Sequence, residues 1–368
     1  MAGAPLGGPV ALWNQPEGFA AELLGMGHEL RFGLSEAAGL EAAFTAIAEV
    51  QEKAVRAGRL APEVREADWG RLTAAFDIAA LSGAAAVIAR PRPGEAAAIM
   101  AATPGALHVF EAPAGAGACG FSRAGKLVEL QGEGAGFAQA AALLRAGGAR
   151  VIAAGWGLGA RLEAAFFAAA ERAVMAGAAP ETVDRVLSVW GFAEPPFLRA
   201  DRIGIPAVAA RLEAAGRAPG VLFTFLAMEG QTGREEGRGV YIYPEPQSAP
   251  KPAPGLAEIL VALRAEAGVT PKPLSAVEIA ARIWAEMAGE GAAALQAGRA
   301  HRAGDVDLAA VATGFPLHHG GPMFLSDRAG LLATRKRLRA LAAEGAPAPV
   351  TLWDVLIRNG RVWAELDG

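Results

Sequence analysis

The sequence predicts an α/β domain with a parallel sheet, followed by an all-helical half of the chain. Short apolar runs alternate with alanine-rich segments from Val10 to about Gly155, which is typical of strands joined by helices in a parallel sheet. Beyond Gly157 such runs nearly disappear. Two stretches of this second half share a weak repeat, so we expect one helical module to occur twice.

The first domain begins with a strand at Val10–Trp13, a helix, and a second strand at 29–32. A long helix is expected over 35–58, where Gly58 ends it. Apolar runs predict further strands at 84–89, 107–111, 126–130 and 150–153. We therefore expect the first domain to span residues 1–155.

The second half begins with a long helix over 161–177, and Pro180 begins the next one. The repeat consists of TVD, GF, PF and ADRIG within 182–204 and DVD, GF, PMF and SDRAG within 305–330. A proline-dense linker, 244–254, lies between the copies. We expect helical domains at 156–250 and 251–368. In the second, Asp305 or Asp307 is expected to cap a helix that Gly314 ends.

Composition excludes several classes of protein. The net charge is −4 and no basic stripe is present, so nucleic acid is not an expected partner. Alanine accounts for the excess in the 53% of hydrophobic residues, and no strongly apolar run reaches eighteen residues, which argues against a membrane span. A single cysteine, Cys119, and five scattered histidines predict no disulfide and no metal site, and favour a reducing cytoplasm.

Three segments of the helical half carry a resemblance to a known family. They are residues 305–330, GREEGRGVYIY at 233–243, and the alanine-rich helix around Arg282. They resemble the C-terminal domain of the 3-hydroxyacyl-CoA dehydrogenases, including the dehydrogenase part of the multifunctional fatty-acid oxidation proteins. The resemblance implies a Rossmann-like domain that holds NAD, then two tandem all-α domains of the 3-hydroxyacyl-CoA dehydrogenase C-terminal (6-phosphogluconate-dehydrogenase-like) type.

The resemblance also implies an activity, the NAD-dependent oxidation of (3S)-3-hydroxyacyl-CoA to 3-oxoacyl-CoA in fatty-acid β-oxidation. In KLVEL at 126–130, Glu129 matches the glutamate that orients the family's catalytic histidine. The matching segment ACGFSRAG contains no histidine, and His108 is the nearest one. We take Glu129 and His108 as catalytic candidates, with a locally bonded strand histidine as the alternative. Ala160 replaces the family's catalytic asparagine.

The turn that would hold the NAD pyrophosphate falls on residues 13–18. Gly18 is its candidate cofactor-binding glycine, beside Trp13, Pro16 and Glu17, and Glu17 places negative charge near the phosphates. Gly33 stands where the family has an acidic residue for the ribose hydroxyls.

Other residues have weaker assignments. Lys53 and Arg56 on the first long helix are candidates for the coenzyme A phosphates of an acyl-CoA substrate, with a solvated helix face as the alternative. We interpret His318 and His319 as surface polar residues and Cys119 as a packing residue.

Two functions remain open from the residues. The first is an NAD-dependent dehydrogenase, and the second is a catalytically silent homologue that binds acyl-CoA or serves as a partner subunit. In duplicated relatives the second helical copy covers the surface that single-copy members use to dimerise, so the resemblance implies a monomer or a weak oligomer.

Overall fold

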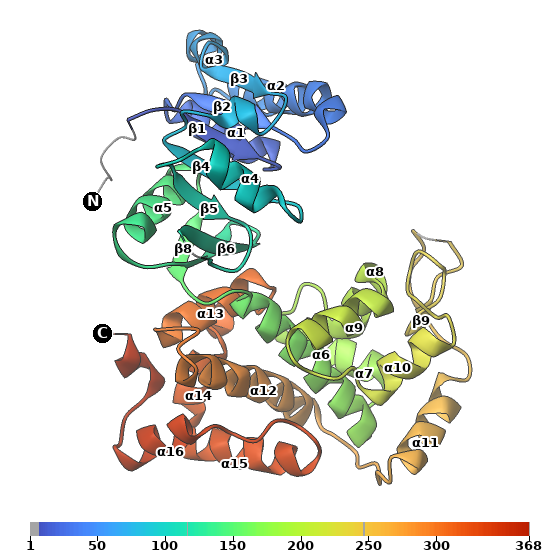
Figure 1. Cartoon of the computed structure of the whole chain (residues 1–368). Coiled ribbons are helices and arrows are strands. Elements are labelled where there is room, and N and C mark those ends of the chain that lie inside the picture. The colour runs from blue at the N-terminus through green and yellow to red at the C-terminus, as the bar shows by residue number, and fades with distance from the viewer. Residues whose placement is uncertain (1–6, 116, 246, 368) are drawn as a thin grey trace. The chain divides into compact units, whose positions relative to one another are not determined.

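The structure, a computed structural model, describes residues 7–115, 117–245 and 247–367. It divides into two compact units, Met1–Trp156 and Gly157–Gly368, and each is described by itself (Figure 1).

The first unit is built on one eight-stranded sheet with the order β3-β2-β1-β4-β5-β6-β7-β8. Neighbouring strands pair in parallel from β3 to β6, β6 and β7 pair antiparallel, and β7 and β8 pair in parallel. The N-terminal unit is therefore the expected Rossmann-like α/β sheet. The strands are β1 (Val10–Trp13), β2 (Leu30–Gly33), β3 (Leu72–Ala75), β4 (Ala86–Ala89), β5 (Leu107–Phe110), β6 (Ala118–Ala124), β7 (Leu127–Gln131) and β8 (Arg150–Ala153).

The sequence-based prediction misses β3, β6 and the reversal of direction at β7. The short strand β3 reads LTAA, so no run of β-branched or aromatic residues marks it. Strand β6 follows a glycine-rich run and contains Gly120 and Ser122, a composition typical of a loop. It forms a hairpin with β7, and a connection this short requires antiparallel strands.

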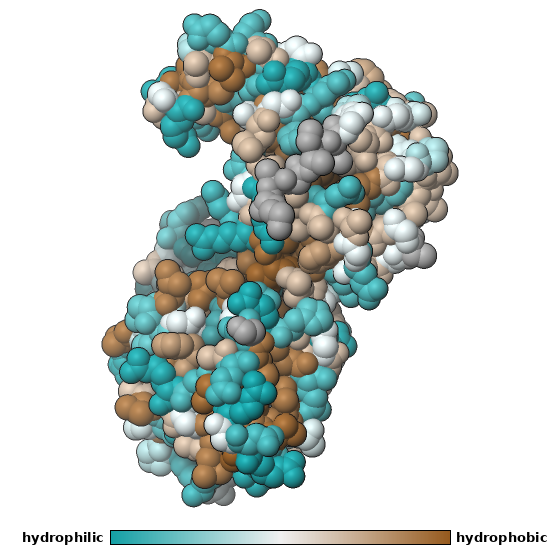
Figure 2. Space-filling view, turned by 90° about the vertical axis from the view of Figure 1, so that its left-hand side faces the viewer, coloured by the Kyte–Doolittle hydropathy of each residue, from teal (hydrophilic) through white to brown (hydrophobic). Residues whose placement is uncertain are grey.

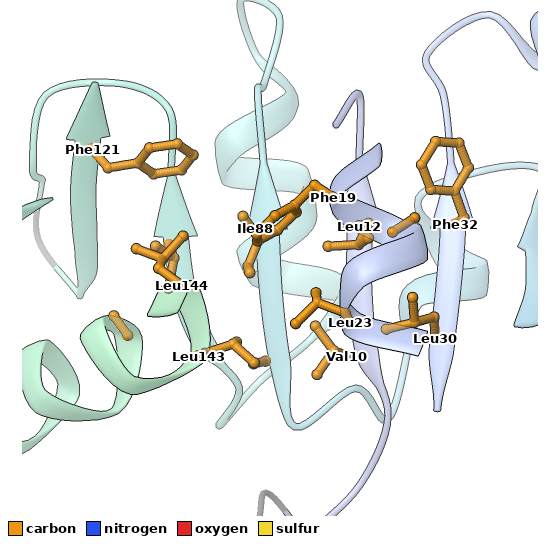
Figure 3. Packing of buried hydrophobic residues seen from close by; sticks show 14 of the residues in the cluster. Val10, Leu12, Phe19, Leu23, Leu30, Phe32, Ile88, Phe121, Leu143 and Leu144 are labelled. Atoms are coloured by element: carbon orange, nitrogen blue, oxygen red, sulfur yellow. The ribbon is translucent and has the colours of Figure 1, made fainter. Parts of the chain in front are cut away.

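Helices cover both faces of the sheet, and the alternation of side chains along β1 explains why. Val10 and Leu12 belong to a buried cluster with α1 and α5, whereas Ala11 and Trp13 pack on the side of α4. Figure 3 shows Phe19 of α1 beside Leu12 and Ile88 in the first cluster. The helices of this unit are α1 (Glu17–Gly25), α2 (Leu40–Arg56), α3 (Pro62–Trp69), α4 (Glu95–Ala102) and α5 (Gly134–Ala146), with 3₁₀ turns η1 (Ala37–Gly39) and η2 (Ala79–Leu81).

The second unit is largely helical, as expected, and its two longest helices, α6 and α12, pack against each other. It also holds a short antiparallel pair, β9 (Tyr241–Ile242) and β10 (Lys251–Pro252), so part of the expected linker is a strand. The helices are α6 (Leu158–Ala176), α7 (Pro180–Trp190), α8 (Pro196–Ile203), α9 (Ile205–Ala214), α10 (Val221–Met228), α11 (Leu256–Glu266), α12 (Ala276–Gln296), α13 (Ala303–Ala312), α14 (Pro322–Ala329), α15 (Leu331–Ala343) and α16 (Thr351–Arg358), with η3 (Leu317–His319) and η4 (Trp363–Leu366).

The predicted cap at Asp305 or Asp307 is wrong, because α13 already begins at Ala303. Asp307 lies inside that helix and instead accepts hydrogen bonds from the backbone N–H groups of Met323 and Phe324, at 2.8 and 3.0 Å. It thereby caps the start of α14.

The same contact occurs a second time in this unit. Asp184 of α7 accepts hydrogen bonds from the N–H groups of Phe197 and Leu198 at the start of α8, both at 3.0 Å. The hydroxyl of Tyr241 also donates to Asp184, at 2.8 Å. Asp184 thus caps the start of α8, as Asp307 caps the start of α14. Each carboxylate accepts from N–H groups that a helix start leaves unpaired.

A second pair of aspartates repeats one helix further on. Asp201 of α8 accepts from the N–H groups of Val240 and Tyr241, at 2.8 and 2.9 Å. Asp327 of α14 accepts from those of Trp363 and Ala364, at 2.9 and 3.0 Å. In both stretches of the sequence repeat, the aspartate of the ADRIG or SDRAG motif therefore accepts from two consecutive backbone N–H groups of a later segment.

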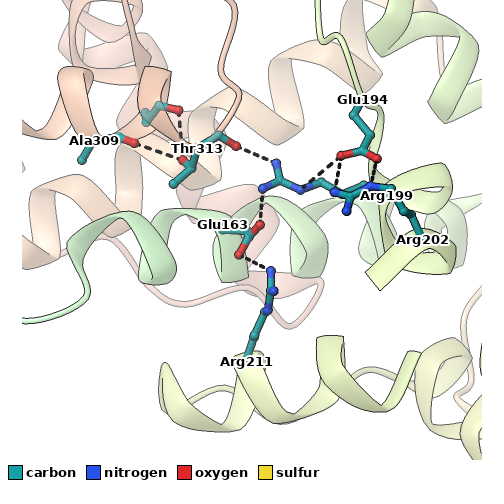
Figure 4. A network of polar contacts seen from close by, with 8 residues as sticks. Glu163, Glu194, Arg199, Arg202, Arg211, Ala309 and Thr313 are labelled. Atoms are coloured by element: carbon teal, nitrogen blue, oxygen red, sulfur yellow. Dashed lines mark hydrogen bonds and ion pairs between the residues drawn. The ribbon is translucent and has the colours of Figure 1, made fainter. Parts of the chain in front are cut away.

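A buried carboxylate on α6 joins four helices of this unit, as Figure 4 shows. Glu163 accepts from Arg211 of α9 at 2.8 Å and also pairs with Arg199 of α8. Arg199 in turn donates to the carbonyl of Thr313, which follows α13, at 2.6 Å. Because Glu163 is buried, loss of either arginine would leave a poorly compensated charge.

In the described residues, no helix is both long and apolar enough to cross a bilayer. On the face that Figure 2 shows, hydrophobic and hydrophilic residues are interspersed. The exposed large apolar side chains include Val189, Met228 and Leu317, which lie on separate elements. Scattered exposure of this kind is normal for a folded surface.

We predict that the helical unit loses stability as the pH rises from about 4 to 8. Burial raises the pKa of Asp184 and of Asp307 to about 7, against the hydrogen bonds that lower it. Between the unfolded pKa of about 3.9 and pH 7 the folded chain therefore binds protons that the unfolded chain does not. The unfolding free energy, measured by urea denaturation, should fall by more than about 1 kcal/mol over this range.

The double variant Asp184→Asn/Asp307→Asn supplies the control, because its side chains do not titrate. Its unfolding free energy should vary less with pH than that of the wild type. Equal pH dependence in the two proteins would show that these carboxylates titrate near their ordinary pKa.

Candidate functional site

The carboxyl ends of four parallel strands form one edge of the first unit's sheet. The register aligns Trp13 of β1 with Gly33 of β2 and Ala89 of β4, and Ala89 with Phe110 of β5. Strands β2 and β3 follow on one side of β1, and β4 and the later strands follow on its other side. Open α/β sheets bind ligands where this order reverses, so the edge between β1 and β4 is the candidate site.

The turn between β1 and α1 lacks the features of a phosphate-binding turn. Asn14 adopts a positive φ of 53°, a conformation that asparagine tolerates better than most residues. Pro16 is the N-cap of α1 and has no N–H to offer a phosphate. Gly18 is exposed, and a Cβ built on it meets no atom within 4 Å. The local structure therefore does not require a glycine at position 18.

Glu95, the first residue of α4, holds the end of β1 and two loops of this edge together. Its Oε2 accepts from the indole N–H of Trp13 at 3.1 Å and from the backbone N–H of Arg92 at 2.9 Å. Its Oε1 accepts from the hydroxyl of Ser35 at 2.6 Å. One carboxylate thus connects the end of β1, the loop after β2 and the loop after β4.

Asn14 strengthens the same connection. Its Oδ1 accepts from the backbone N–H of Ser35 at 2.8 Å, and its amide group donates to the carbonyl of Arg90 at 3.1 Å. Glu36 and Arg92 form an ion pair at 2.7 Å between the loops after β2 and β4. These polar groups therefore satisfy one another, where a dinucleotide site would present them to a ligand. The side-chain amide of Gln15, in the same turn, is buried and has no hydrogen-bond partner among the described residues.

Glu95 keeps its negative charge at neutral pH. Burial alone would raise the pKa of Glu95, but the hydrogen bonds from Ser35, Arg92 and Trp13, with the charge of Arg92, outweigh burial and lower it. A fixed anion repels a phosphate 4 Å away by about 4 kcal/mol at an effective dielectric constant of 20. The residues at this edge therefore do not fit the NAD that the resemblance implies.

The Trp13 indole also explains why no acidic residue ends β2. A Cβ built on Gly33 would lie 2.6 Å from the Trp13 ring and 2.8 Å from the carbonyl of Ala75. Trp13 is buried, with 2% of its surface exposed. Its ring thus occupies the space that a ribose-binding carboxylate would need.

Glu129 of β7 lies in the middle of the β6–β7 hairpin. It is buried and directly opposite Ser122, whose hydroxyl donates to its Oε2 at 2.5 Å. Ser122 belongs to the ACGFSRAG segment that matches the histidine-bearing segment of the family. A serine hydroxyl, which is not a base near neutral pH, therefore contacts Glu129.

The structure does not bring His108 and Glu129 together. His108 pairs with Ala118 on β6, whereas Glu129 pairs with Ser122. Four residues of strand separate these β6 positions, about 13 Å. His108 is buried, its Nε2 lies 2.9 Å from the Thr103 hydroxyl, and burial lowers its pKa. It is thus a locally bonded strand histidine, too far away for direct proton exchange with Glu129.

The remaining predicted residues lie apart from this edge or take structural roles. Lys53 and Arg56 are exposed in the last turn of α2. Ala160 is exposed in the first turn of α6, and the next residue, Arg161, pairs with Glu290 at 2.6 Å.

The histidine pair and the cysteine also take structural roles. His319 stacks on Trp190 with ring centroids 3.8 Å apart, and His318 lies beside it. Cys119 is buried, and burial raises the pKa of its thiol, so it is not an activated nucleophile. Within the described ranges, no group of three or more histidine, cysteine, aspartate or glutamate side chains could hold a metal ion.

Sequence reasoning missed Glu95, Ser35 and the contact of Ser122 with Glu129. Glu95 follows RPRPG after β4, where an acidic residue normally signals only a helix start. Ser122 lies in β6, a strand whose composition is typical of a loop. Only the fold brings these residues to Trp13 and Glu129.

The fold, a Rossmann-like sheet followed by a largely helical region, is one that solved structures of several dehydrogenases share. The structure resembles 3-hydroxybutyryl-CoA dehydrogenase from Escherichia coli, with a TM-score of 0.75 and 18% identity over 96% of this chain and 99% of that one. It also resembles the dehydrogenase part of multifunctional enzyme 1 from C. elegans, with a TM-score of 0.56 and 15% identity over 85% and 80%. No family model matches the sequence.

Sequence comparison also finds curated proteins that are similar to part of this chain. The chain is 29% identical over 181 residues to the peroxisomal bifunctional enzyme of Danio rerio. The aligned region covers 44% of this chain and 25% of that protein. It is 28% identical over 165 residues to the glyoxysomal fatty acid beta-oxidation multifunctional protein MFP-a of Cucumis sativus, covering 42% and 23%. The chain is thus a distant homologue of these multifunctional β-oxidation proteins, and the match spans about a quarter of their length.

We predict that Gly33→Ala destabilises the first unit by about 1–3 kcal/mol, because the new methyl group overlaps the Trp13 ring. Urea denaturation of Gly33→Ala, Trp13→Ala and the double variant measures the coupling. The cost of Gly33→Ala should shrink when Trp13 is already alanine. Strictly additive costs would show that the Trp13 ring does not set the requirement for glycine.

Proposed function

We propose that this chain is a catalytically silent homologue of the 3-hydroxyacyl-CoA dehydrogenases, which binds acyl-CoA or serves as a partner subunit without transferring hydride. One observation carries the proposal. Glu129, the match for the family's orienting carboxylate, contacts the hydroxyl of Ser122 at 2.5 Å, and His108 lies about 13 Å further along the sheet. A general base that could take the proton of a 3-hydroxyl group is therefore not supplied by this pair.

The helical unit supports a finer reading of the fold. We propose that residues 156–250 and 251–368 are two copies of one helical domain. The repeated capping by Asp184 and Asp307, and by Asp201 and Asp327, supports this division. Ion pairs between the copies, such as Arg172 with Glu286 and Arg161 with Glu290, support a monomer in which each copy covers the other.

The second candidate is the NAD-dependent oxidation of 3-hydroxyacyl-CoA in β-oxidation, which the names of the relatives and the retention of Glu129 in KLVEL favour. When bound, NAD would accept the hydride from the substrate carbon. The closed edge around Glu95 argues against it. A cytoplasmic location remains our expectation, because Cys119 is the only cysteine in the sequence.

Steady-state assays separate the two candidates. We expect the purified chain to oxidise no NADH in the presence of acetoacetyl-CoA, as followed at the NADH absorbance band. Isothermal titration calorimetry should still detect acetoacetyl-CoA if the chain binds acyl-CoA. NADH oxidation that requires acetoacetyl-CoA and is lost in Glu129→Gln would contradict the silent role.

A variant and a matched control test whether Lys53 and Arg56 contact the coenzyme A phosphates. If Lys53 and Arg56 contact them, Lys53→Ala/Arg56→Ala should weaken acetoacetyl-CoA binding by about tenfold. Arg185→Ala removes an exposed arginine from α7 and should leave the affinity unchanged. Failure of the wild type to bind acetoacetyl-CoA would leave the partner-subunit role.

A further inference from the structure

The edge between β1 and β4 holds an anion that belongs to the chain itself. Glu95 accepts hydrogen bonds from one indole N–H, one backbone N–H and one hydroxyl, at 2.6–3.1 Å. These are the kinds of donor that phosphate-binding sites offer to a ligand. The carboxylate therefore occupies an anion position in the sheet's ligand-binding edge.

The carboxylate also closes this edge physically. It joins Trp13, Ser35 and Arg92, and Asn14 ties the loop after β1 to Ser35 and to the carbonyl of Arg90. A dinucleotide that lies across the end of β1 must pass between the loops after β2 and β4. Those loops are connected through Glu95 and through the pair of Glu36 with Arg92.

The start of α1 offers few groups that could bind a phosphate. Pro16 has no N–H, and Glu17 adds a carboxylate to the first helical turn. A ligand phosphate would therefore have to displace one carboxylate and lie near another.

We propose that Glu95 is an internal ligand, whose carboxylate takes the place of a dinucleotide phosphate and keeps the switch-point edge closed. The inference rests on the proposed function, since it explains why hydride transfer is lost, but it makes a separate claim about binding. Removing the carboxylate should free the donors of Trp13, Ser35 and Arg92 for an external anion. The closed site is thus a latent dinucleotide site.

Titration with NADH tests the proposal directly. NADH fluorescence and calorimetry should show no saturable binding to the wild type, with a Kd weaker than about 1 mM. The variant Glu95→Ala/Pro16→Gly, which removes the carboxylate and restores an N–H at the start of α1, should bind NADH at least about tenfold more tightly. Glu111→Ala is the control, because Glu111 follows β5 and pairs with Arg90 at 2.9 Å outside the Glu95 network.

Each outcome decides the inference. Saturable NADH binding by the wild type overturns it without any variant, and then the acetoacetyl-CoA assay still judges hydride transfer separately. A double variant with a wild-type circular dichroism spectrum that gains no affinity also overturns it, since Glu95 would then not be what excludes the ligand. An equal gain in Glu111→Ala would show a general charge effect and equally contradict the specific role of Glu95.

Discussion

The carboxylate of Glu95 is the contact on which the ligand-binding edge of this chain depends. It accepts hydrogen bonds from the end of β1 and from the loops after β2 and β4, and these bonds keep it charged. Such edges normally stay open because a ligand supplies the charge that the donors need. Here a carboxylate of the chain itself supplies that charge.

Two further features agree with this arrangement. Trp13 fills the space beside Gly33 where a ribose-binding side chain would lie, and Ser122 occupies the neighbourhood of Glu129. In the helical unit, by contrast, buried aspartates and glutamates bond to helix starts and arginines. The buried carboxylates of this unit thus hold its helices together.

The sequence alone predicts the class of fold and the change from α/β to helical structure near residue 156. Strong apolar runs mark β1, β4 and β5, but LTAA and ACGFSRA do not mark β3 and β6, because tertiary pairing overrides their weak propensity. The site residues likewise divide into those that the sequence marks and those that only the fold brings together. The loss of the histidine and of the glycine turn can be read from the residues. Glu95 cannot, since only the parallel register carries its helix start to Trp13 and Ser35.

A crystal structure of the chain grown with millimolar NADH tests the central claim most directly. We expect the Glu95 carboxylate to remain bonded to Trp13, Ser35 and the N–H of Arg92, with no dinucleotide at the start of α1. A dinucleotide whose pyrophosphate lies between Asn14 and the start of α1, with Glu95 turned away, would contradict it.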